Sequence, residues 1–425
     1  MKVLLVSANR ERDLNMAVMP LGPACVAEAV KRAGHETALL DLMFETDMRA
    51  ALAQAIASTK PECIGISVRN VDDQTMQSPR FLLGNVKEVV KICRSLSSAP
   101  LVLGGAGYTI FPEEALVYLG ADMGVEGEGE VLFPALLSAL EKGDDIMGMP
   151  GIHIAGERPQ CSKAFVKNLD LLPLPDPELL LSAAAHNPEP WIPAQTRRGC
   201  PMRCSYCSTA NIEGAAIRRH SPQTVVAWLE KWVSAGYGNF YFVDNTFNLP
   251  VSYAKTLCRL ICEKGMDITW CAIVYPGRLD AELVTLMAQA GCKQVSLGFE
   301  SGSEKILRNM NKRFSLEDVR AASRLFAKQE VARMGFLLLG GPGETQETVE
   351  ESLSFADSLQ LDALRLTAGI RIYPNTPLAV IAEEQGLIES RRNLLSPAFY
   401  IVPELAAWLP ERLKEWAASR PNAML

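Results

Sequence analysis

Three cysteines form the group of residues in this chain that is best suited to chemistry. Cys200, Cys204 and Cys207 have the spacing C-x3-C-x2-C within a short segment that also contains Gly199 and Pro201. A tight loop that directs three thiolates inward can hold three irons of a 4Fe–4S cluster, whereas electron-carrier clusters usually take four cysteines. The fourth iron would then stay open to a substrate or a cofactor.

Two other interpretations of these thiols exist. A zinc site needs a fourth ligand nearby, and the next candidates in the chain are His220 and Cys258. The three cysteines could also be unrelated buried residues, since a free cysteine behaves as a small hydrophobe. The spacing and the neighbouring Tyr206 favour the iron–sulfur cluster over both.

The triad, with an aromatic residue directly before its last cysteine, resembles the radical S-adenosylmethionine (SAM) enzymes. The resemblance implies that the open iron chelates the amino and carboxylate groups of SAM. It also implies an external electron donor, such as a flavodoxin or a ferredoxin, that reduces the cluster.

The elements that must position the cysteine loop alternate between strand and helix. Strands are predicted at residues 193–196, 240–243, 268–273, 294–299, 334–339 and 366–372, with helices at 222–235, 253–264, 281–290, 316–329 and 345–359. Six such units close three-quarters of a barrel, and barrel chemistry lies at the carboxyl ends of the strands. The sequence therefore predicts a partial (βα)6 TIM barrel over residues 191–385, with the cysteines after its first strand.

By resemblance, residues at these strand ends contact SAM. Asp244 and Asn245 follow the second strand, where the family binds the methionyl amino group. Glu300 and Ser301 follow the fourth, and the carboxylate suits the ribose hydroxyls because it offers two acceptor oxygens. Arg313, or alternatively Lys312, would pair with the methionyl carboxylate.

Later strand ends complete the predicted site. Gly340 lies in Leu339-Gly-Gly-Pro-Gly343, whose flat backbone would let adenine lie close. Tyr373 lies in the segment 371–377, which resembles the family's contact with the adenine edge and the substrate cavity. Tyr275 follows the third strand and is predicted to reach the substrate. The alternative for Asp244-Asn245 and for the glycine-rich segment is an ordinary turn.

The first 145 residues also alternate between strand and helix. Strands are predicted at 2–9, 36–41, 63–68 and 101–104, and helices at 20–34, 48–59 and 83–96. This order predicts an α/β domain with a doubly wound, Rossmann-like parallel sheet. Ligands of such sheets bind at the carboxyl ends of the strands.

The loops at that edge resemble a cobalamin-binding domain of the methionine-synthase type. Ser67 takes the place of the serine that meets the nucleotide base of cobalamin, and a glycine pair lets the backbone approach the nucleotide tail closely. A Rossmann-like domain without cobalamin is the alternative. The positions matched to the family's cofactor contacts are Pro20, Gly22, Ser67, Asn70, Gly104, Gly105, Thr109 and Glu128.

One departure from that family concerns the cobalt ligand. The histidine that binds cobalt from below is missing, because no histidine lies between Met1 and Gly34. Arg69 stands where the family has a leucine. We therefore predict cobalamin without a protein lower axial ligand and with Arg69 under the corrin, where a cation cannot coordinate cobalt but favours Co(I). The alternative is that Arg69 pairs with Asp72 or Asp73 at the surface.

The remaining segments are predicted to connect and extend these domains. Residues 146–190 form a linker, with a small hairpin at 151–165 and a proline-rich extended strap at 169–177. Residues 386–425 form a short C-terminal tail with an amphipathic helix at 410–419. A short tail suggests a substrate held mostly in the cleft between the two domains.

Composition limits the class of protein. The chain has 425 residues, 48% of them hydrophobic, and a net charge of −7, which fits a two-domain globular protein and argues against a nucleic-acid surface. No apolar run approaches the ~18–20 residues of a membrane span. The N-terminal strand runs directly into charged residues, so it does not resemble a signal peptide. Without an export signal, the eleven cysteines are expected to be reduced thiols, which predicts a cytoplasmic protein.

Together the resemblances imply a cobalamin-dependent radical SAM methyltransferase. It would move a methyl group from SAM, by way of methylcobalamin, to an unactivated carbon of a small-molecule or lipid-like substrate. Three alternatives stay open: a non-methylating enzyme that uses the same cofactors for ring formation or oxidative rearrangement, polar methyl transfer to an sp2 carbon, and a non-catalytic cobalamin sensor or carrier.

Overall fold

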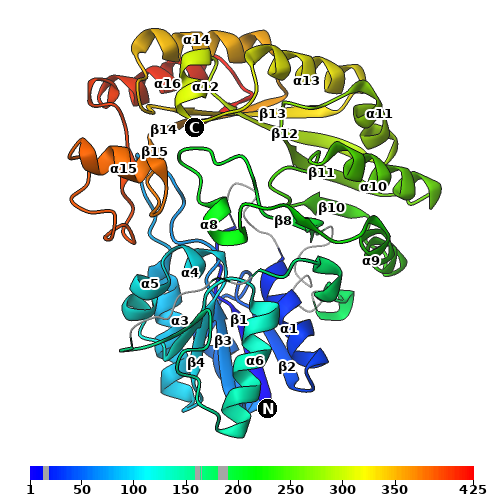
Figure 1. The fold of residues 1–425 in the computed structure, drawn as a ribbon, viewed down its shortest axis with the longest axis vertical. Coiled ribbons are helices and arrows are strands. Elements are labelled where there is room, and N and C mark those ends of the chain that lie inside the picture. The colour runs from blue at the N-terminus through cyan, green and yellow to red at the C-terminus, as the bar shows by residue number, and fades with distance from the viewer. Residues whose placement is uncertain (13–18, 158–162, 164, 180–189) are drawn as a thin grey trace. The chain divides into compact units, whose positions relative to one another are not determined.

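The computed structural model describes residues 1–12, 19–157, 163, 165–179 and 190–425 (Figure 1). These residues divide into two compact units. The first unit comprises residues 1–73 and 81–192, and the second comprises residues 74–80 and 193–425. The short segment 74–80 therefore belongs to the second unit although the chain on both sides of it belongs to the first.

The first unit is built on a six-stranded sheet in the order β2-β1-β3-β4-β5-β6. Neighbouring strands are parallel, except that β6 pairs antiparallel with β5. The parallel strands are short apolar runs, which is typical of strands covered on both faces. The strands are β1 (Lys2–Ser7), β2 (Glu36–Asp41), β3 (Cys63–Ser67), β4 (Leu101–Gly104), β5 (Met123–Val125) and β6 (Ile152–Ile154).

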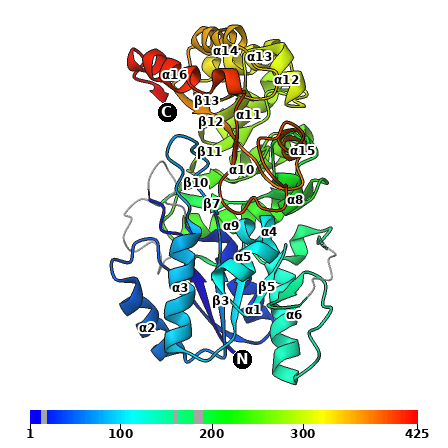
Figure 2. The same cartoon turned by 90° about the vertical axis from the view of Figure 1, so that its left-hand side faces the viewer.

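Helices cover both faces of this sheet. Helices α2 and α3 lie on one side of it and α6 on the other (Figure 2). On the α6 side, Val30, Phe133 and Leu136 form a buried core with the sheet residues Val3 and Val102. The predicted doubly wound fold is confirmed. The helices are α1 (Leu21–Arg32), α2 (Met48–Thr59), α3 (Leu83–Leu96), α4 (Ala106–Ile110), α5 (Pro112–Leu119) and α6 (Gly129–Lys142).

The described part of the predicted linker begins with β6. This strand joins the edge of the main sheet by pairing with β5, and its residues belong to the first unit. The second half of the predicted hairpin falls partly on residues 158–162 and 164, and the predicted linker also includes residues 180–189. These residues lie outside the described part of the chain, so the hairpin stays a prediction.

The second unit contains a seven-stranded parallel sheet in the order β17-β14-β13-β12-β11-β10-β7. Its six other strands correspond to the six predicted ones, so the partial barrel is confirmed. The edge strand β17 (Ala423–Met424) was not predicted, and it brings the end of the predicted tail beside β14. The others are β7 (Ile192–Ala194), β10 (Asn239–Phe242), β11 (Thr269–Val274), β12 (Cys292–Glu300), β13 (Ala332–Leu339) and β14 (Ala363–Ala368).

Helices α10, α11, α13 and α14 cover the outer face of this sheet (Figure 1). Their starts agree with local capping chemistry: Ser315 and Asp318 form a capping box at α13, and Ser221 caps α9 with Pro222 in its first turn. The longer helices are α9 (Pro222–Ser234), α10 (Val251–Glu263), α11 (Ala281–Gln289), α13 (Leu316–Lys328), α14 (Gln346–Ser358), α15 (Pro377–Glu384) and α16 (Trp408–Ala418). Within the described residues, no helix combines the length and the apolar character that crossing a membrane requires.

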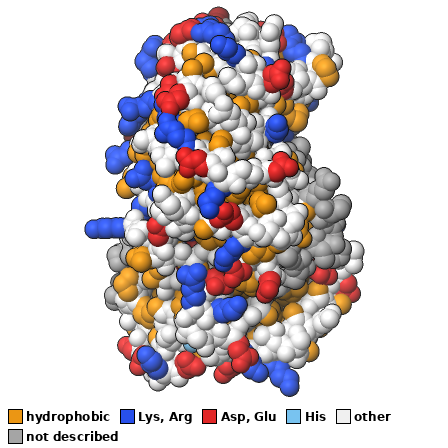
Figure 3. All heavy atoms as spheres, turned by 90° about the vertical axis from the view of Figure 1, so that its right-hand side faces the viewer, with side chains coloured by type: hydrophobic (Ala, Val, Ile, Leu, Met, Phe, Trp, Pro, Cys, Tyr) orange, Lys and Arg blue, Asp and Glu red, His pale blue; other side chains and the backbone are white. Residues whose placement is uncertain are grey.

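Most charged side chains lie at the surface with both signs interspersed, as the face in Figure 3 shows. A typical surface group is Lys255 with Asp280 and Glu282. Such exposed pairs contribute little to stability because water screens them. The buried ion pairs of the second unit are different, and two of them lie beside the cysteine loop.

Candidate functional site

The cysteine loop leaves the first barrel strand and is closed by a small antiparallel ladder. Strand β8 (Arg197–Arg198) pairs with β9 (Arg218–Arg219), and the N–H of Cys200 donates to Gly214 O at 3.1 Å. Gly199 has φ +91°, and a Cβ there would lie 2.1 Å from Ala216 O. Only glycine fits this position, so the backbone turns sharply just before the first cysteine.

The structure brings the three thiols together. Burial raises the pKa of Cys200, and it raises that of Cys204 to about 11. Cys207 adds to both shifts, which shows that the sulfurs influence one another. In the described part of the chain, no three His, Cys, Asp or Glu side chains are placed to share a single metal ion. A 4Fe–4S cluster instead takes each thiolate on a different iron, and the protons leave as iron binds.

A buried carboxylate holds the start of this loop. Asp244 lies two residues after the end of β10. It accepts hydrogen bonds from Thr196 N (2.7 Å), Thr196 Oγ1 (2.6 Å) and Arg197 N (3.1 Å), and its Oδ2 lies 3.2 Å from Arg197 Nε. Both oxygens are therefore occupied in a fully buried position. A direct contact of Asp244 with SAM, as the sequence predicts, would require the loss of one of these bonds. The structure instead gives Asp244 a place in the support of the loop.

Arg197 completes this support. Its guanidinium lies 4.6 Å from the ring centroid of Tyr253 and 5.4 Å from that of Phe247, and Nη1 donates to Leu249 O at 2.5 Å. Sequence reasoning did not single out Arg197, although two arginines directly before the triad were a signal.

Asn245 takes part in a second support. Its Nδ2 donates to Glu213 Oε2 at 2.6 Å, and the same oxygen accepts from Gly199 N at 3.0 Å. Glu213 ends the short helix α8 (Thr209–Glu213) that follows the cysteines. Asn245 is half-buried, so it stays a candidate for SAM contact. Through Glu213 it also helps to fix the cysteine loop at Gly199.

Glu300 has an unusual backbone. It ends β12 with φ +66°, and the pairing of β12 with β13 is irregular between Leu297 and Glu300. A non-glycine residue in the left-handed region carries backbone strain, which the surrounding structure must maintain. Its Oε1 accepts from Lys312 Nζ at 3.1 Å. Its neighbour Ser301 is fully buried and hydrogen-bonds Ser352 at 3.0 Å, so a SAM contact by its hydroxyl would also require rearrangement.

Other predicted positions have different surroundings. Arg313 is exposed, whereas the ammonium of the alternative residue Lys312 is buried against Glu300. Asn248 clamps Tyr275 by accepting from its N–H at 2.7 Å and donating to its carbonyl at 2.9 Å. The Tyr275 ring packs edge-to-face on Phe314 with centroids 5.3 Å apart. Tyr275 is thus held rigidly.

The glycine-rich loop after β13 is fixed by a carboxyl group that the sequence reasoning missed. Glu344 Oε2 accepts from the N–H groups of Gly340 and Gly341, at 2.5 and 2.9 Å. Gly340 has φ +95°. After β14, Arg371 is buried and donates to Leu394 O at 2.8 Å, with its guanidinium 5.1 Å from the Tyr373 ring centroid.

Glu344 gives the second unit a pH-dependent stability. Burial raises its pKa from 4.5 to about 7, so the folded chain binds this proton more tightly than the unfolded chain. The free energy of unfolding is therefore expected to fall as the pH rises from about 4.5 to about 7. Glu344→Gln keeps an acceptor for both N–H groups and removes the titration. We expect it to flatten the pH dependence of the urea midpoint; parallel curves for parent and variant would contradict this assignment.

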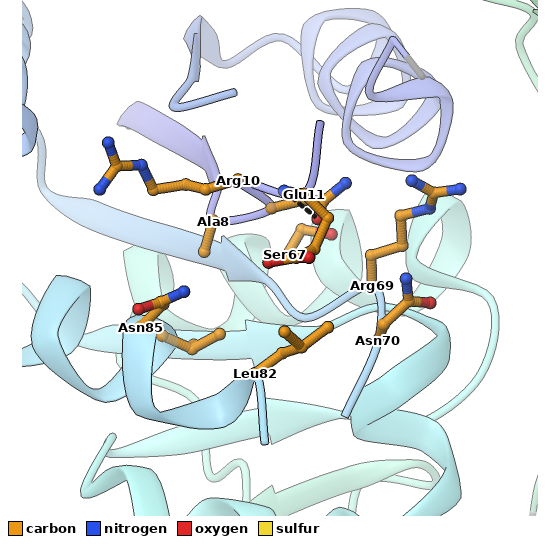
Figure 4. A pocket seen from close by; sticks show the side chains of 10 residues that line it. Ala8, Arg10, Glu11, Ser67, Arg69, Asn70, Leu82 and Asn85 are labelled. Atoms are coloured by element: carbon orange, nitrogen blue, oxygen red, sulfur yellow. Dashed lines mark hydrogen bonds between the residues drawn. The ribbon is translucent and has the colours of Figure 1, made fainter. Parts of the chain in front are cut away.

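In the first unit, a pocket lies at the carboxyl ends of β1 and β3 (Figure 4). Arg69 and Arg10 extend at opposite sides of it, with Glu11 and Ser67 between them (Figure 4). Arg69 is exposed and lowers the pKa of Asp41, although burial raises that pKa to about 6 overall. The residues around this pocket are Ala8, Asn9, Arg10, Glu11, Ser67, Arg69, Asn70, Leu82, Asn85 and Val86.

The edge of this pocket offers several hydrogen-bonding groups. Asn9 Nδ2 and Arg10 Nε are buried with no hydrogen-bond partner in the described part of the chain. These donors, with the hydroxyl of Ser67 and the amides of Asn70 and Asn85, match the amide-substituted rim of a corrin. The sequence predicted Ser67, Arg69 and Asn70 here and missed the β1 end.

The remaining predicted cobalamin contacts belong to neighbouring loops. Gly105 has φ +100°, and a Cβ there would lie 2.6 Å from Val68 O, so this loop packs tightly on the one that carries Ser67. Thr109 donates to Gly105 O at 3.0 Å and accepts from Gly127 N at 3.1 Å, which gives it a structural role inside the loops.

Three further positions differ in how much room they have. Glu128 Oε2 accepts a hydrogen bond from Val166 N at 2.7 Å and so fixes the linker before the strap. Pro20 caps the start of α1, and a Cβ on Gly22 in the first turn would meet no atom within 4 Å. A Cβ on Gly104 would meet only Val125 O, at 3.9 Å. Space for a close approach therefore exists at Gly22 and Gly104.

Comparisons with known proteins agree with a chain of two units, one for each of two known families. The B12 binding domain family matches residues 13–137, and the Radical SAM superfamily matches residues 195–356. The chain is 28% identical to an uncharacterised methyltransferase of Pyrococcus horikoshii, over 89% of this chain and 82% of that protein. It is 24% identical to tryptophan 2-C-methyltransferase of Streptomyces laurentii, over 90% of this chain and 74% of that protein.

A solved structure is also similar. The radical S-adenosylmethionine methyltransferase TsrM from Kitasatospora setae, with tryptophan and a SAM analogue bound, superposes with a TM-score of 0.88 at 23% identity. The match covers 100% of this chain and 90% of that one. At this identity, the likeness supports the fold alone.

Proposed function

Because the chain belongs to the cobalamin-dependent radical SAM methyltransferase family, we propose that it transfers a methyl group from SAM, by way of cobalamin, to an unactivated carbon of a small molecule. One observation carries the proposal: a single chain combines a C-x3-C-x2-C loop at the carboxyl edge of a partial barrel with a donor-lined pocket at the carboxyl edge of a doubly wound sheet.

The chain's residues would bind and orient the reacting groups. When bound, a 4Fe–4S cluster supplies electrons to SAM, and cobalamin carries the methyl group. Cys200, Cys204 and Cys207 hold the cluster, and an external flavodoxin- or ferredoxin-like protein reduces it. The protein of such an enzyme binds and orients the reacting groups, because the cofactors perform the difficult chemistry. The proposed SAM contacts are Asn245, Glu300, Arg313, Gly340 and Tyr373.

A rigid aromatic pair supports our proposal of an aromatic substrate. Tyr275 and Phe314 pack edge-to-face, and Asn248 fixes the Tyr275 backbone on both sides. Both rings are buried, and an aromatic pair of this kind beside the substrate would favour a flat, apolar group over a flexible chain. Tryptophan, the substrate named for the Streptomyces relative, is therefore a suitable first member of a test panel.

The decisive experiment follows the methyl group. The reduced, cofactor-loaded chain is incubated with SAM that carries a deuterated methyl group and with a panel of aromatic and aliphatic small molecules. We expect one product to gain the mass of the labelled methyl group. Consumption of SAM with an altered product but no label would favour the non-methylating alternative. A chain that takes up no corrinoid would reject the proposal.

We further propose that Arg69 replaces a lower axial ligand of cobalt. Its support is the position of Arg69 on the pocket edge next to Ser67, together with the absence of histidine from residues 1–34. A guanidinium cannot coordinate cobalt, and its fixed charge favours the electron-rich Co(I) form. Cobalt without a lower ligand also gives up a methyl cation more readily, which would suit polar transfer to an sp2 carbon.

Arg69→Met and Arg69→His test this role. Arg69→Met is expected to lower methyl transfer about 10- to 100-fold, as loss of a group that tunes a metal commonly does. The electron paramagnetic resonance (EPR) signal of bound Co(II) is expected to show no nitrogen coupling in the parent or in Arg69→Met. Arg69→His offers a nitrogen and is the positive control. Nitrogen coupling in the parent would contradict the assignment.

A further inference from the structure

Lys312 and Glu300 form a buried ion pair beside the cysteine loop. Lys312 Nζ lies 3.1 Å from Glu300 Oε1 and donates to Gly298 O at 3.4 Å. The two side chains are only 7% and 14% exposed. Burial by itself lowers the pKa of Lys312, but this pKa lies well above its ordinary value because the Glu300 carboxylate, and after it Tyr206, stabilise the ammonium.

This ammonium lies close to the cysteines. Its Nζ is 5.4 Å from the ring centroid of Tyr206, one of the two residues between Cys204 and Cys207. The two chain segments are joined directly, since Ser205 N donates to Met310 O at 3.0 Å. The buried ammonium therefore lies beside the segment that joins Cys204 and Cys207.

The position of Glu300 is held at a cost to the backbone. Its φ of +66° and the irregular pairing at the end of β12 direct the carboxylate to the ammonium. Such strain persists only where the surrounding structure imposes it. Arg308, one turn before Lys312, has an exposed side chain, and water screens its charge. The Lys312–Glu300 pair therefore places two opposite, poorly screened charges beside the segment that joins Cys204 and Cys207.

We propose that Lys312 and Glu300 act as opposite fixed charges that set the reduction potential of the cluster held by the three cysteines. The inference rests on the proposed function only for the presence of that cluster. Reduction adds one electron, taken from a reduced flavin or iron–sulfur carrier that is oxidised by one electron. Lys312 stabilises the added negative charge and raises the potential, and Glu300 lowers it, because cluster potentials follow local charge and burial.

The test is an EPR-monitored redox titration of the full chain, reconstituted with iron and sulfide, without SAM, cobalamin or substrate. Lys312→Met is expected to shift the midpoint potential to more negative values, and Glu300→Gln to more positive values. Arg308→Met removes an exposed cation from the preceding helical turn and is expected to leave the potential unchanged. Shifts of the same sign, or no shift in either variant, would overturn the proposal.

A charge-conserving control and a second variant keep the result decisive. Lys312→Arg keeps the charge and is expected to retain both the iron content and the potential. If Lys312→Met binds no iron, the isosteric Glu300→Gln decides alone: a positive shift supports the proposal, and any other result overturns it. A chain that transfers no methyl label can still show opposite shifts, so failure here is distinct from failure of the proposed function.

Discussion

Replacement of Cys200, Cys204 and Cys207 by alanine is expected to abolish iron binding and methyl transfer together. Product formation should fall below about 0.1% of the parent, because the protein offers orientation while the cofactors perform the chemistry. We expect the variant to lose the bound iron and sulfide, the broad absorbance at about 400 nm that thiolate-bound clusters give, and the labelled product.

The loop is expected to stay folded in this variant. Its supports, the Asp244 contacts with Thr196 and Arg197 and the Glu213 contact with Gly199, do not use the cysteines. Circular dichroism should therefore match the parent. Cys262→Ala, at a half-exposed position of α10, is the matched control and should keep both iron and activity. A triple variant that retained iron and full activity would reject the cluster assignment.

Asp244→Ala is expected to lower the free energy of unfolding by about 3–5 kcal/mol, the usual effect of removing one partner of a buried ion pair. The substitution would leave the Arg197 guanidinium between Phe247 and Tyr253 without its carboxylate, and two backbone N–H groups of the loop without their acceptor. Urea unfolding measures the change. Lower iron content at temperatures where the chain stays folded would report displacement of the cysteines.

A double-mutant cycle separates the pair from its surroundings. Combining Asp244→Asn with Arg197→Met removes both charges, and we expect the double variant to be more stable than either single variant, since no buried charge stays uncompensated. Glu317→Ala breaks a surface pair with Arg324 and should leave the urea midpoint unchanged. Equal midpoints for Asp244→Ala and the surface control would contradict the supporting role of Asp244.

The sequence predicted the elements of both units well, for physical reasons that are local. Apolar periodicity marks Glu36–Asp41 and Met48–Thr59, which begin and end as predicted, and Lys60 in the left-handed conformation ends the latter helix. The cysteine loop was recognisable because its chemistry resides in three neighbouring thiols. β17 was not predicted, since two residues carry no periodic pattern.

Side-chain partners within the site could not be predicted in the same way. Asp244 was expected to meet SAM, but its oxygens are taken by residues 47 and 48 positions earlier in the chain. Lys312 looked like a second choice for the SAM carboxylate because nothing in the sequence shows that the Glu300 backbone turns its carboxyl group toward it. Distant pairs of this kind depend on how strands align, which spacing alone does not encode.

The segment 74–80 has a consequence for how the protein can be divided. Because it belongs with the second unit, the polypeptide passes from one unit to the other between residues 73 and 74, 80 and 81, and 192 and 193. Met76 fills the place where a side chain on Gly369 would project, and Gln77 donates to Ala368 O at 3.4 Å. A cut at residue 192 would therefore remove native residues from the barrel, and the two halves cannot be exchanged with those of a relative as intact modules.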